Sequence, residues 1–406
     1  KTSDRHSWYL VLKIVFFTFY YPPDLCAGSF RAIALAQALS ERMKDDDELH
    51  IITTHPNRYE NHRVKADNVE MHGNITVHRI SVPSHKSGML SQARTFITYA
   101  LASYKLSNNL NPDFLIGTTS RLMTGVLTGI SARKLGCKYF IDLRDIFSET
   151  ISDIFSQKSK LLGFVSKTTF SLLERWLFNK AIGVNVVSAG FPEYFQAKGV
   201  DTSNWSFFPN GVDKEFINLP FIENKNSKNI KTILYAGNIG SGQGLETVLP
   251  ATAKRMGSRY RFLVIGGGGA SSKLINAIKS NNVNNIEILP PVKREKLIKY
   301  YKDADILFLH LNDIPAFRRV LPSKIFEYTA LRRPIVAGLG GYSAKFIVDN
   351  VPYATIFNSG DVDGCVDAIK KAESLEVKDK NIDIFVEKYS REKIMNKMAK
   401  HIFSLL

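Results

Sequence analysis

The chain has 406 residues, of which 44% are hydrophobic and 23% charged, a composition typical of globular proteins that excludes disordered and fibrous classes. Lys and Arg number 54 against 38 Asp and Glu, so the formal net charge is +16 and an anionic partner is expected: a phosphate-bearing substrate, an anionic membrane or a nucleic acid. Three widely separated cysteines favour neither a disulfide framework nor a zinc site.

The N-terminal apolar run gives no sign of a signal peptide. It extends from Trp8 to Tyr21, is interrupted by Lys13, ends at two prolines and lacks a cleavage site of small residues. No segment reaches the roughly 18 uncharged apolar residues that a bilayer-spanning helix requires. We therefore expect a cytoplasmic protein.

The first half alternates apolar strands with amphipathic helices. A β-branched and aromatic run at 12–19 predicts a strand, helical spacing follows over 29–43, and another strand is expected at 49–53. The pattern continues with a strand, a helix and a strand at 114–117, 122–134 and 138–143. Near-continuous apolar strands of this kind predict a parallel sheet that is covered on both faces.

A polar segment at 210–229 reads as a linker, and the alternation starts again at Lys231. The expected strands and helices of the second half are 232–236, 245–253, 261–265, 271–279, 286–289, 295–301, 306–309, 323–331 and 334–337. The predicted fold class is therefore α/β, with two Rossmann-like doubly wound domains of about 200 residues each.

A glycine-rich loop follows the first strand of the second half, from Gly237 to Gly244. Glycines allow the backbone to approach a phosphate, and the N-terminus of the next helix supplies N–H donors. A tight loop selected only for its backbone angles is the alternative, and the order of residues does not match a P-loop. The glycines at 266–269 lack dinucleotide-binding spacing and favour close helix–sheet packing.

The segment 321–328 carries the most specific pattern. Pro322 and Ser323 predict a helix start capped by Ser323. Lys324 then lies in the first turn, where the helix dipole disfavours a cation unless it faces an anion. Glu327 lies one turn further, near the same face, and can accept hydrogen bonds from a ribose diol. This pair suits a nucleotide-sugar, and an ordinary Lys–Glu helix pair is the alternative.

Charged residues also follow two strands of the first half. Asp142, Arg144 and Asp145 end the strand at 138–143, and ligands of parallel sheets bind beyond such ends. A buried Asp–Arg pair that braces the loop is an equal alternative. Gly28 and Arg31 open the helix after the first strand and form another end suited to an anion. No His or Cys spacing supports a metal site.

The segment 155–180 combines basic side chains with a broad apolar surface, as an interfacial membrane helix does, although a core helix has the same pattern. The segment 89–105 is a second candidate. The predicted membrane contacts are Lys158, Lys160, Phe164, Lys167 and Trp176.

Five motifs in order resemble retaining glycosyltransferases of the glycosyltransferase-B fold, family 4, and in particular bacterial transferases that build O-antigen and capsule repeat units, some of which move N-acetylated aminosugars. The motifs are Tyr21-Pro22-Pro23 with Gly28-Ser29 and Arg31, Asp142-Leu143-Arg144-Asp145, Pro209-Asn210-Gly211-Val212-Asp213, Tyr235-Ala236-Gly237-Asn238-Ile239-Gly240 and Pro322-Ser323-Lys324-Ile325-Phe326-Glu327-Tyr328.

The resemblance implies an acceptor-binding domain at 1–210, completed by a final helix at 385–406, and a nucleotide-sugar-binding domain at 211–384. It implies that Glu327, the second glutamate of the family's Glu-x7-Glu pattern, holds the ribose, and that Lys324 faces the diphosphate. The first glutamate position is Arg319 here, and Asn238 and Gln243 stand where many relatives have Arg and Lys. The other expected donor contacts are Gly28, Asn238, Gly240, Gly242, Gln243, Arg318, Arg319 and Ser323.

The predicted activity is metal-independent transfer of a sugar, with anomeric retention, from a UDP-linked donor to a lipid-linked acceptor at the inner face of the cytoplasmic membrane, in lipopolysaccharide, O-antigen or capsule synthesis. Lys324 would stabilise the leaving diphosphate, and Asp142 or Asp145 would orient the acceptor. Arg31 and Arg144 are expected acceptor contacts. No cofactor and no nucleic acid partner are expected. A sugar-nucleotide 2-epimerase, a nicotinamide-dependent dehydrogenase and a basic peripheral membrane or nucleic-acid-binding protein are the alternatives.

Overall fold

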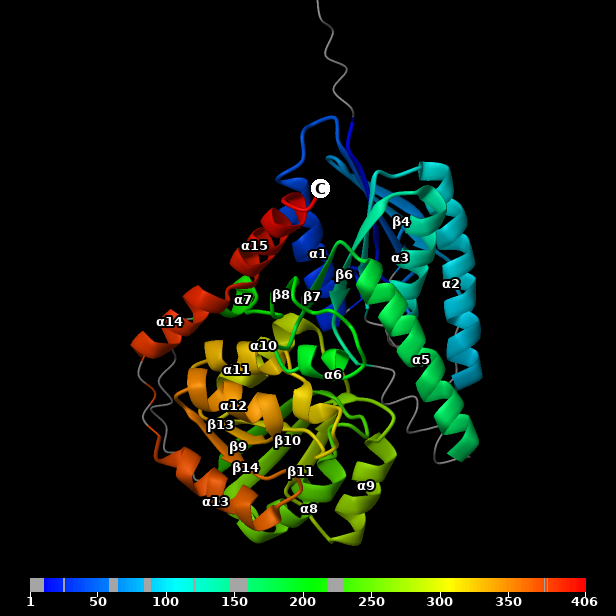
Figure 1. Ribbon diagram of the computed structural model, residues 1–406. Helices are drawn as coiled ribbons and strands as arrows, with labels where there is room; N and C mark the ends of the chain where they lie inside the picture. Colours follow the sequence, from blue (N-terminus) through cyan, green and yellow to red (C-terminus); the bar gives the residue numbers. More distant parts are fainter. Residues whose placement is uncertain are drawn as a thin grey trace, which may run out of the picture. The chain divides into compact units, whose positions relative to one another are not determined.

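A computed structural model describes residues 11–24, 26–57, 65–83, 89–119, 122–146, 160–217, 219, 230–375, 377 and 379–406 (Figure 1). The chain divides into two compact units. The first comprises Lys1–Asn210 and Glu392–Leu406, and the second comprises Gly211–Arg391. Each is an α/β domain with its own sheet, as the sequence predicts.

The first unit is built on an eight-stranded sheet in the order β3-β4-β2-β1-β5-β6-β7-β8, parallel except for the antiparallel pair of β3 and β4. The strands are β1 (Lys13–Phe17), β2 (Glu48–Thr54), β3 (Val69–His72), β4 (Ile75–Ile80), β5 (Phe114–Thr118), β6 (Lys138–Leu143), β7 (Gly183–Val186) and β8 (Trp205–Phe207). The last four residues of β1 are 0% exposed, which explains its continuous apolar run.

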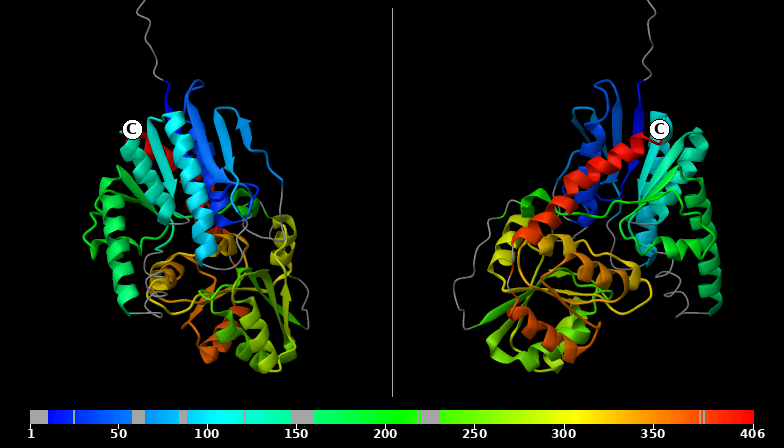
Figure 2. Two further views of the ribbon diagram at one scale, coloured as in Figure 1. Left: turned by 90° about the vertical axis from the view of Figure 1, so that its right-hand side faces the viewer. Right: turned by 60° about the vertical axis from the view of Figure 1, so that its left-hand side comes forward.

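Helices cover both faces of this sheet (Figures 1 and 2). On one face lie α1 (Ala27–Ser40) and α15 (Arg391–Phe403), and on the other lie α2 (Met89–Leu110), α3 (Leu122–Leu135) and α5 (Lys160–Lys180). Helix α3 packs against both α2 and α5. The short helix α6 (Pro192–Gln196) connects β7 to β8. Strand β1 lies between β2 and β5, so the strand order reverses direction next to the start of α1.

The second unit has a six-stranded, wholly parallel sheet in the order β11-β10-β9-β12-β13-β14. The strands are β9 (Lys231–Asn238), β10 (Tyr260–Gly267), β11 (Ile286–Leu289), β12 (Ile306–His310), β13 (Ile335–Gly338) and β14 (Ala354–Phe357). One face carries α8 (Leu245–Met256), α9 (Ser271–Ser280) and α13 (Val362–Glu373), and the other carries α10 (Arg294–Asp303), α11 (Lys324–Ala330) and α12 (Gly341–Asn350).

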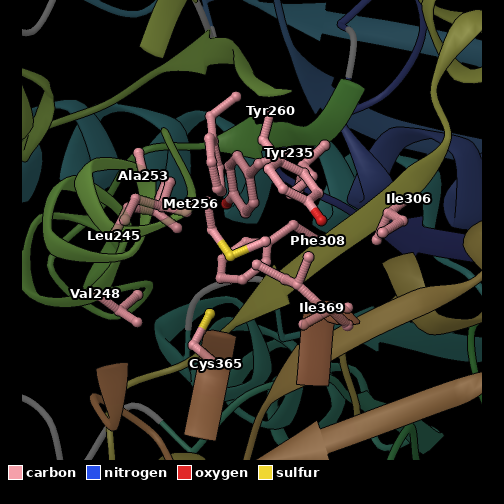
Figure 3. Packing of buried hydrophobic residues seen from close by; sticks show 14 of the residues in the cluster. Tyr235, Leu245, Val248, Ala253, Met256, Tyr260, Ile306, Phe308, Cys365 and Ile369 are labelled. Carbon is pink, nitrogen blue, oxygen red and sulfur yellow. The ribbon is translucent and has the colours of Figure 1, made fainter. Parts of the chain in front are cut away.

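A cluster of buried apolar side chains joins the α8 face of the second sheet to the helices that cover it. Figure 3 shows side chains from α8, α13 and the central strands gathered together, among them Val248, Phe308 and Cys365. Two short 3₁₀ helices, η1 (Gly257–Arg259) and η2 (Phe317–Arg319), follow α8 and precede α11. This core fixes β9 and β12, whose carboxyl ends carry the loops described below.

Two expected elements differ from the structure. The predicted linker 210–229 contains a helix, α7 (Lys214–Ile217), anchored by the buried ring of Phe216. The single final helix expected at 385–406 is two helices, α14 (Asp379–Tyr389) and α15. The break occurs at Ser390, because the N–H of Arg391 donates to the carbonyl of Val212 (2.8 Å) and is not used within a helix.

Candidate functional site

The loop after β9 lies where the strand order of the second sheet reverses. Strand β9 is flanked by β10 on one side and β12 on the other, and ligands of doubly wound sheets bind at such a point. Gly237 of β9 and Gly266 of β10 pair across the sheet, and a Cβ on Gly266 would lie 1.8 Å from the carbonyl oxygen of Gly237. The two backbones therefore approach more closely than any side chain would allow.

Lys324 extends from the first turn of α11 across the backbone of Gly237. A Cβ at position 237 would lie 2.3 Å from Lys324 Nζ, and Gly237 has φ +147°. The ammonium lies 5.5 Å from the ring centroid of Tyr235 and makes no hydrogen bond or ion pair with the described residues. Burial lowers the pKa of Lys324, while Glu327 opposes the shift. The glycine therefore makes room for a cation that has no hydrogen-bond or ion-pair partner among the described residues.

Glu327 lies one turn along α11, and its carboxylate accepts no hydrogen bond from the described residues. Burial raises the pKa of Glu327, and the positive charges of Arg294, Arg391 and Lys324 oppose this rise. Arg294 and Arg391 themselves form ion pairs with Asp213. Partly buried charges without direct partners are costly to a fold and typical of binding or catalytic sites. The expected pair is therefore a candidate for binding a ligand.

Hydrogen bonds from Gln243 close the glycine loop. Its Oε1 accepts from the backbone N–H of Gly240 (3.1 Å) and from Asn238 Nδ2 (3.0 Å). The side chains of Asn238 and Gln243, both expected to contact a donor, therefore bond to each other. A Cβ on Gly242 would lie 2.5 Å from the ring of Phe317, so this glycine is required by packing against η2.

Two residues that support the glycine loop were not predicted from the sequence. His310 is 0% exposed; its Nδ1 lies 2.7 Å from the carbonyl of Gln243, and its Nε2 accepts from the N–H of Gly360 (2.9 Å). Because Gly360 is a donor, the ring is assigned as neutral with its proton on Nδ1. The backbone N–H of Asn312 donates to the carbonyl of Gly242 (2.9 Å). His310 is the last residue of β12, and Asn312 lies just after it. Neither residue belongs to a recognisable sequence motif.

The other donor contacts predicted near α11 are arranged differently from expectation. Arg318 forms a bidentate pair with exposed Asp313 (2.6 and 2.8 Å), so its charge is already matched. Arg319 donates to the carbonyl of Pro315 (3.1 Å) and is partly buried. The prediction that Ser323 caps α11 by its side chain is wrong, because this residue has helical backbone angles and makes no capping bond.

In the first unit, Arg31 and Asp142 form a fully buried ion pair. Arg31 Nε and Nη2 each donate to a carboxylate oxygen at 2.8 Å, and both side chains are 1% exposed. Asn185 Nδ2 donates to the same carboxylate (2.7 Å). Burial would raise the pKa of Asp142, but the Arg31 guanidinium holds it below its ordinary value. The two side chains therefore form a buried Asp–Arg pair, although with Arg31 as the partner of Asp142, and their predicted roles in catalysis and acceptor binding stay predictions.

The remaining residues of that cluster lie nearer the surface. Asp145 is exposed, and Arg144 is partly buried. Arg144 Nη1 lies against Gly28, where a Cβ would be only 2.6 Å away. Gly28, expected to contact a donor, and Arg144, expected to contact an acceptor, therefore lie at one place.

Helix α5 carries the predicted membrane contacts. Phe164, at 70%, and Leu172, at 62%, are exposed, as is Lys167. Trp176 is partly buried and packs its ring over Gly129 of α3, where a Cβ would lie 2.9 Å from the ring. Lys158 lies outside the described residues, as does the side chain of Lys160.

In the described part of the chain, no helix is long and apolar enough to cross a membrane, and no three or more His, Cys, Asp or Glu side chains are grouped so that they could hold a metal ion.

Comparisons with known proteins agree on one family. Residues 32–211 match the family model described as a glycosyl transferase 4-like domain, and residues 218–389 match that of glycosyl transferases group 1. A curated relative, the putative colanic acid biosynthesis glycosyl transferase WcaI of Escherichia coli (strain K12), is 25% identical over 233 residues, 54% of this chain and 56% of the relative. The match thus spans little more than half the relative's length.

Solved structures resemble the whole fold. Sucrose-phosphate synthase from Thermosynechococcus elongatus has a TM-score of 0.72 at 14% identity, covering 97% of this chain and 99% of the other. Anabaena HepE in complex with UDP and glucose scores 0.67 at 14% identity, over 97% and 100%. WaaG, a glycosyltransferase involved in lipopolysaccharide biosynthesis, scores 0.66 at 12% identity, over 96% and 99%. With one glycosyl transferase model matched in each half and two Rossmann-like domains, the chain belongs to the glycosyltransferases of the glycosyltransferase-B fold.

Proposed function

We propose that the protein is a retaining glycosyltransferase that moves a sugar, an N-acetylated aminosugar, from a UDP-linked donor to a lipid-linked acceptor in the synthesis of a bacterial surface polysaccharide. The observation that carries the proposal is the pair of Lys324 and Glu327 beside the glycine loop. Both residues are partly buried, and their ammonium and carboxylate groups have no hydrogen-bond partner among the described residues. The named relatives of colanic acid and lipopolysaccharide synthesis support the pathway class.

The donor would bind across the loop at 237–244. The Lys324 ammonium and the N–H groups at the start of α8 face the diphosphate, and the Glu327 carboxylate accepts hydrogen bonds from the ribose hydroxyls. In the transition state the bond from the sugar to the diphosphate breaks and negative charge grows on the leaving oxygens. Lys324 stabilises that charge electrostatically, and this stabilisation needs no bound metal ion.

Retention would follow from attack on the same face that the diphosphate leaves. The acceptor oxygen forms the new bond to the sugar carbon, and its proton passes to the departing diphosphate. No carboxylate nucleophile is needed, which is consistent with Asp142 being fully engaged by Arg31 and Asn185. Asp145, which is exposed, remains the candidate to orient the acceptor hydroxyl.

A lipid-linked acceptor would require the protein to act at the inner face of the cytoplasmic membrane. Its support is the exposed apolar surface of Phe164 and Leu172 beside Lys167, together with the net charge of +16. Replacing both apolar residues by Ser should reduce flotation with phosphatidylglycerol vesicles, whereas replacing Met71, 73% exposed on β3, should not. Equal flotation of both variants would contradict membrane contact by α5.

The transfer itself is tested by incubating the protein with UDP-N-acetylglucosamine or UDP-glucose and a prenyl-diphosphate-linked saccharide. We expect a product whose new linkage keeps the donor's anomeric configuration, as read by NMR, and faster turnover of the aminosugar. An inverted linkage would contradict retention. Formation of an epimer from the donor without an acceptor would identify the protein as a 2-epimerase.

A further inference from the structure

Strands β9 and β12 pair over only a small part of their length. Their register ends at Leu234 and Leu307, whereas β9 stays paired with β10 up to Asn238. The carbonyl of Thr232 accepts from the N–H of Asp305 just before β12, so the even-numbered residues of β9 direct their backbone groups toward β12. Beyond the paired segment, those backbone groups must find partners other than β12.

Two tyrosine hydroxyls are those partners. The N–H of Ala236 donates to the Tyr328 hydroxyl (3.2 Å), and the Tyr235 hydroxyl donates to the carbonyl of Asn238 (2.6 Å). Both tyrosines are buried, and Tyr235 belongs to the apolar cluster on the α8 face (Figure 3). Burial raises the pKa of Tyr235 well above its ordinary value, so its hydroxyl keeps its proton and remains a hydrogen-bond donor.

The Tyr235 hydroxyl and the Lys324 ammonium border the same space. A Cβ on Gly237 would lie 2.3 Å from Lys324 Nζ and 3.7 Å from the Tyr235 hydroxyl oxygen. The carbonyl that this hydroxyl occupies belongs to Asn238, the residue directly after Gly237. An ammonium is a charged donor with three N–H groups, so it would compete for this carbonyl if the hydroxyl were absent.

The Lys324 ammonium makes no such bond. It has no hydrogen-bond or ion-pair partner among the described residues, and burial lowers its pKa. A partly buried ammonium is unfavourable unless it meets an acceptor or an anion. A hydrogen bond to the Asn238 carbonyl would relieve this cost, but it would use a donor that a phosphoryl group could otherwise accept from.

We propose that Tyr235 is a positioning residue for Lys324: by holding the Asn238 carbonyl, its hydroxyl keeps the ammonium free for the diphosphate of the nucleotide-sugar. The ring of Tyr235 contributes as well. The ammonium lies over this ring, 5.5 Å from its centroid, and attraction to the ring face orients the cation without occupying its N–H groups. Naming the diphosphate as the ligand rests on the proposed function, whereas the competition for the carbonyl rests on the contacts alone.

The first experiment measures the pKa of Lys324 by NMR of its isotope-labelled Cε in the wild type, Y235F and Y328F. The signal is assigned by its absence in K324M. In Y235F the ring is kept, but the freed carbonyl accepts from the ammonium and stabilises its charged form, so the pKa of Lys324 should rise. Y328F is the control within the site, because it frees the N–H of Ala236, which an ammonium cannot bond, and it should leave the pKa of Lys324 unchanged.

A structural role for the Tyr235 hydroxyl would give a different result. It would lower stability without raising the pKa of Lys324. An unchanged or lowered pKa of Lys324 in Y235F would therefore overturn the proposal, and so would failure of Y235F to fold.

The second experiment measures transfer from UDP-N-acetylglucosamine. In Y235F, kcat/KM for the donor should fall about tenfold, and the alkaline limb of its pH profile should move to higher pH together with the pKa of Lys324. Y139F is the matched control, because Tyr139 of β6 is also buried and its hydroxyl donates to a backbone carbonyl, that of Leu177, at 2.6 Å. Y139F should keep the kinetics and the pH profile of the wild type.

A double variant tests whether Tyr235 acts through Lys324. Adding Y235F to K324M should cause no further loss of kcat/KM, because the ammonium that the hydroxyl positions is already absent. A further tenfold loss would show that the hydroxyl acts by another route and would overturn the proposal. Wild-type kcat in K324M would contradict the role of Lys324 in transfer and leave the NMR comparison standing, so the two proposals fail independently.

Discussion

Lys324 occupies the space that a side chain at position 237 would fill, because its Nζ lies 2.3 Å from an ideal Cβ on Gly237. The same glycine has φ +147°, a backbone conformation that other residues rarely adopt. Gly237 of β9 thus determines where the Lys324 ammonium can lie. The relationship connects a loop that the sequence singled out for its glycines with a helix that it singled out for its charges.

Substitution of Gly237 by Ala should therefore act on Lys324. The added methyl displaces the ammonium and strains the backbone, so kcat/KM for the donor should fall about 10²-fold, the cost of misplacing a catalytic group by about 1 Å. Steady-state donor turnover measures the loss. Gly269→Ala is the control, because its Cβ would meet no atom within 4 Å. Equal activity of the two variants would show that the room at position 237 does not matter.

Glu327→Gln should change the pH dependence of donor binding. Burial raises the pKa of Glu327 above its ordinary value of 4.5, so the wild-type carboxylate becomes protonated, and loses acceptor capacity for the ribose hydroxyls, as the pH falls toward that raised pKa. Affinity for UDP should therefore decline on acidification in the wild type and vary less in the variant. The variant should also lose little further affinity when UDP is replaced by its dideoxyribose analogue.

The raised pKa of Glu327 also determines the stability that we expect of E327Q. A carboxyl group whose pKa is raised in the folded state binds protons more tightly there than in the unfolded state, so it opposes folding at neutral pH. E327Q should be at least as stable as the wild type by urea unfolding. A clear loss of stability would identify Glu327 as a structural residue.

His310 should make the free energy of unfolding fall as the pH is lowered, whereas the raised pKa of Glu327 acts in the opposite direction. Burial lowers the pKa of His310 below its ordinary value of 6.5, so the unfolded state takes up the proton first. Its contribution is present above pH 6.5 and is lost as the pH falls below that value. Protonation also removes the acceptor for Gly360 N–H.

His310→Phe should cost about 1–3 kcal/mol at neutral pH, because it leaves the Gln243 carbonyl and the Gly360 N–H unpaired, and it should flatten the fall in unfolding free energy on acidification. Urea unfolding at several pH values provides the measurement. His72→Gln is the control, since the side chain of His72 is 68% exposed. The same pH slope in wild type and H310F would refute the lowered pKa of His310.

The Arg31–Asp142 pair should be a stability determinant. Asp142→Ala leaves a buried guanidinium uncompensated and should lower the unfolding free energy by about 3–5 kcal/mol. The double variant with Arg31→Met should lose less than the sum of the two single losses, because the two residues form one ion pair. If D142A folds with wild-type stability and lacks only activity, Asp142 is a catalytic residue after all.

The sequence predicts the α/β class and the grouping of Gly237, Lys324 and Glu327 because glycine loops, a helix start and apolar strands are local patterns. It does not predict which charges neutralise each other. Arg31 and Asp142 are 111 positions apart, and their pairing depends on the strand order. Apolar periodicity likewise does not show that the ring of Trp176 packs over Gly129.

The break between α14 and α15 has a similar origin. It depends on a hydrogen bond from Arg391 to Val212, residues that are far apart in the sequence, so helical spacing alone predicts one continuous helix at 385–406. The support given by His310 is also non-local, since its ring joins Gln243 to Gly360.

The central claim is that Lys324 binds and stabilises the diphosphate of an activated sugar. The direct measurement is donor turnover and thermal stability of Lys324→Met beside Lys345→Met, whose lysine is exposed and paired with Asp349. The account predicts that K324M loses about 10²–10³-fold in kcat while its midpoint is unchanged or raised, and that K345M keeps full activity. Wild-type kcat in K324M would contradict the account.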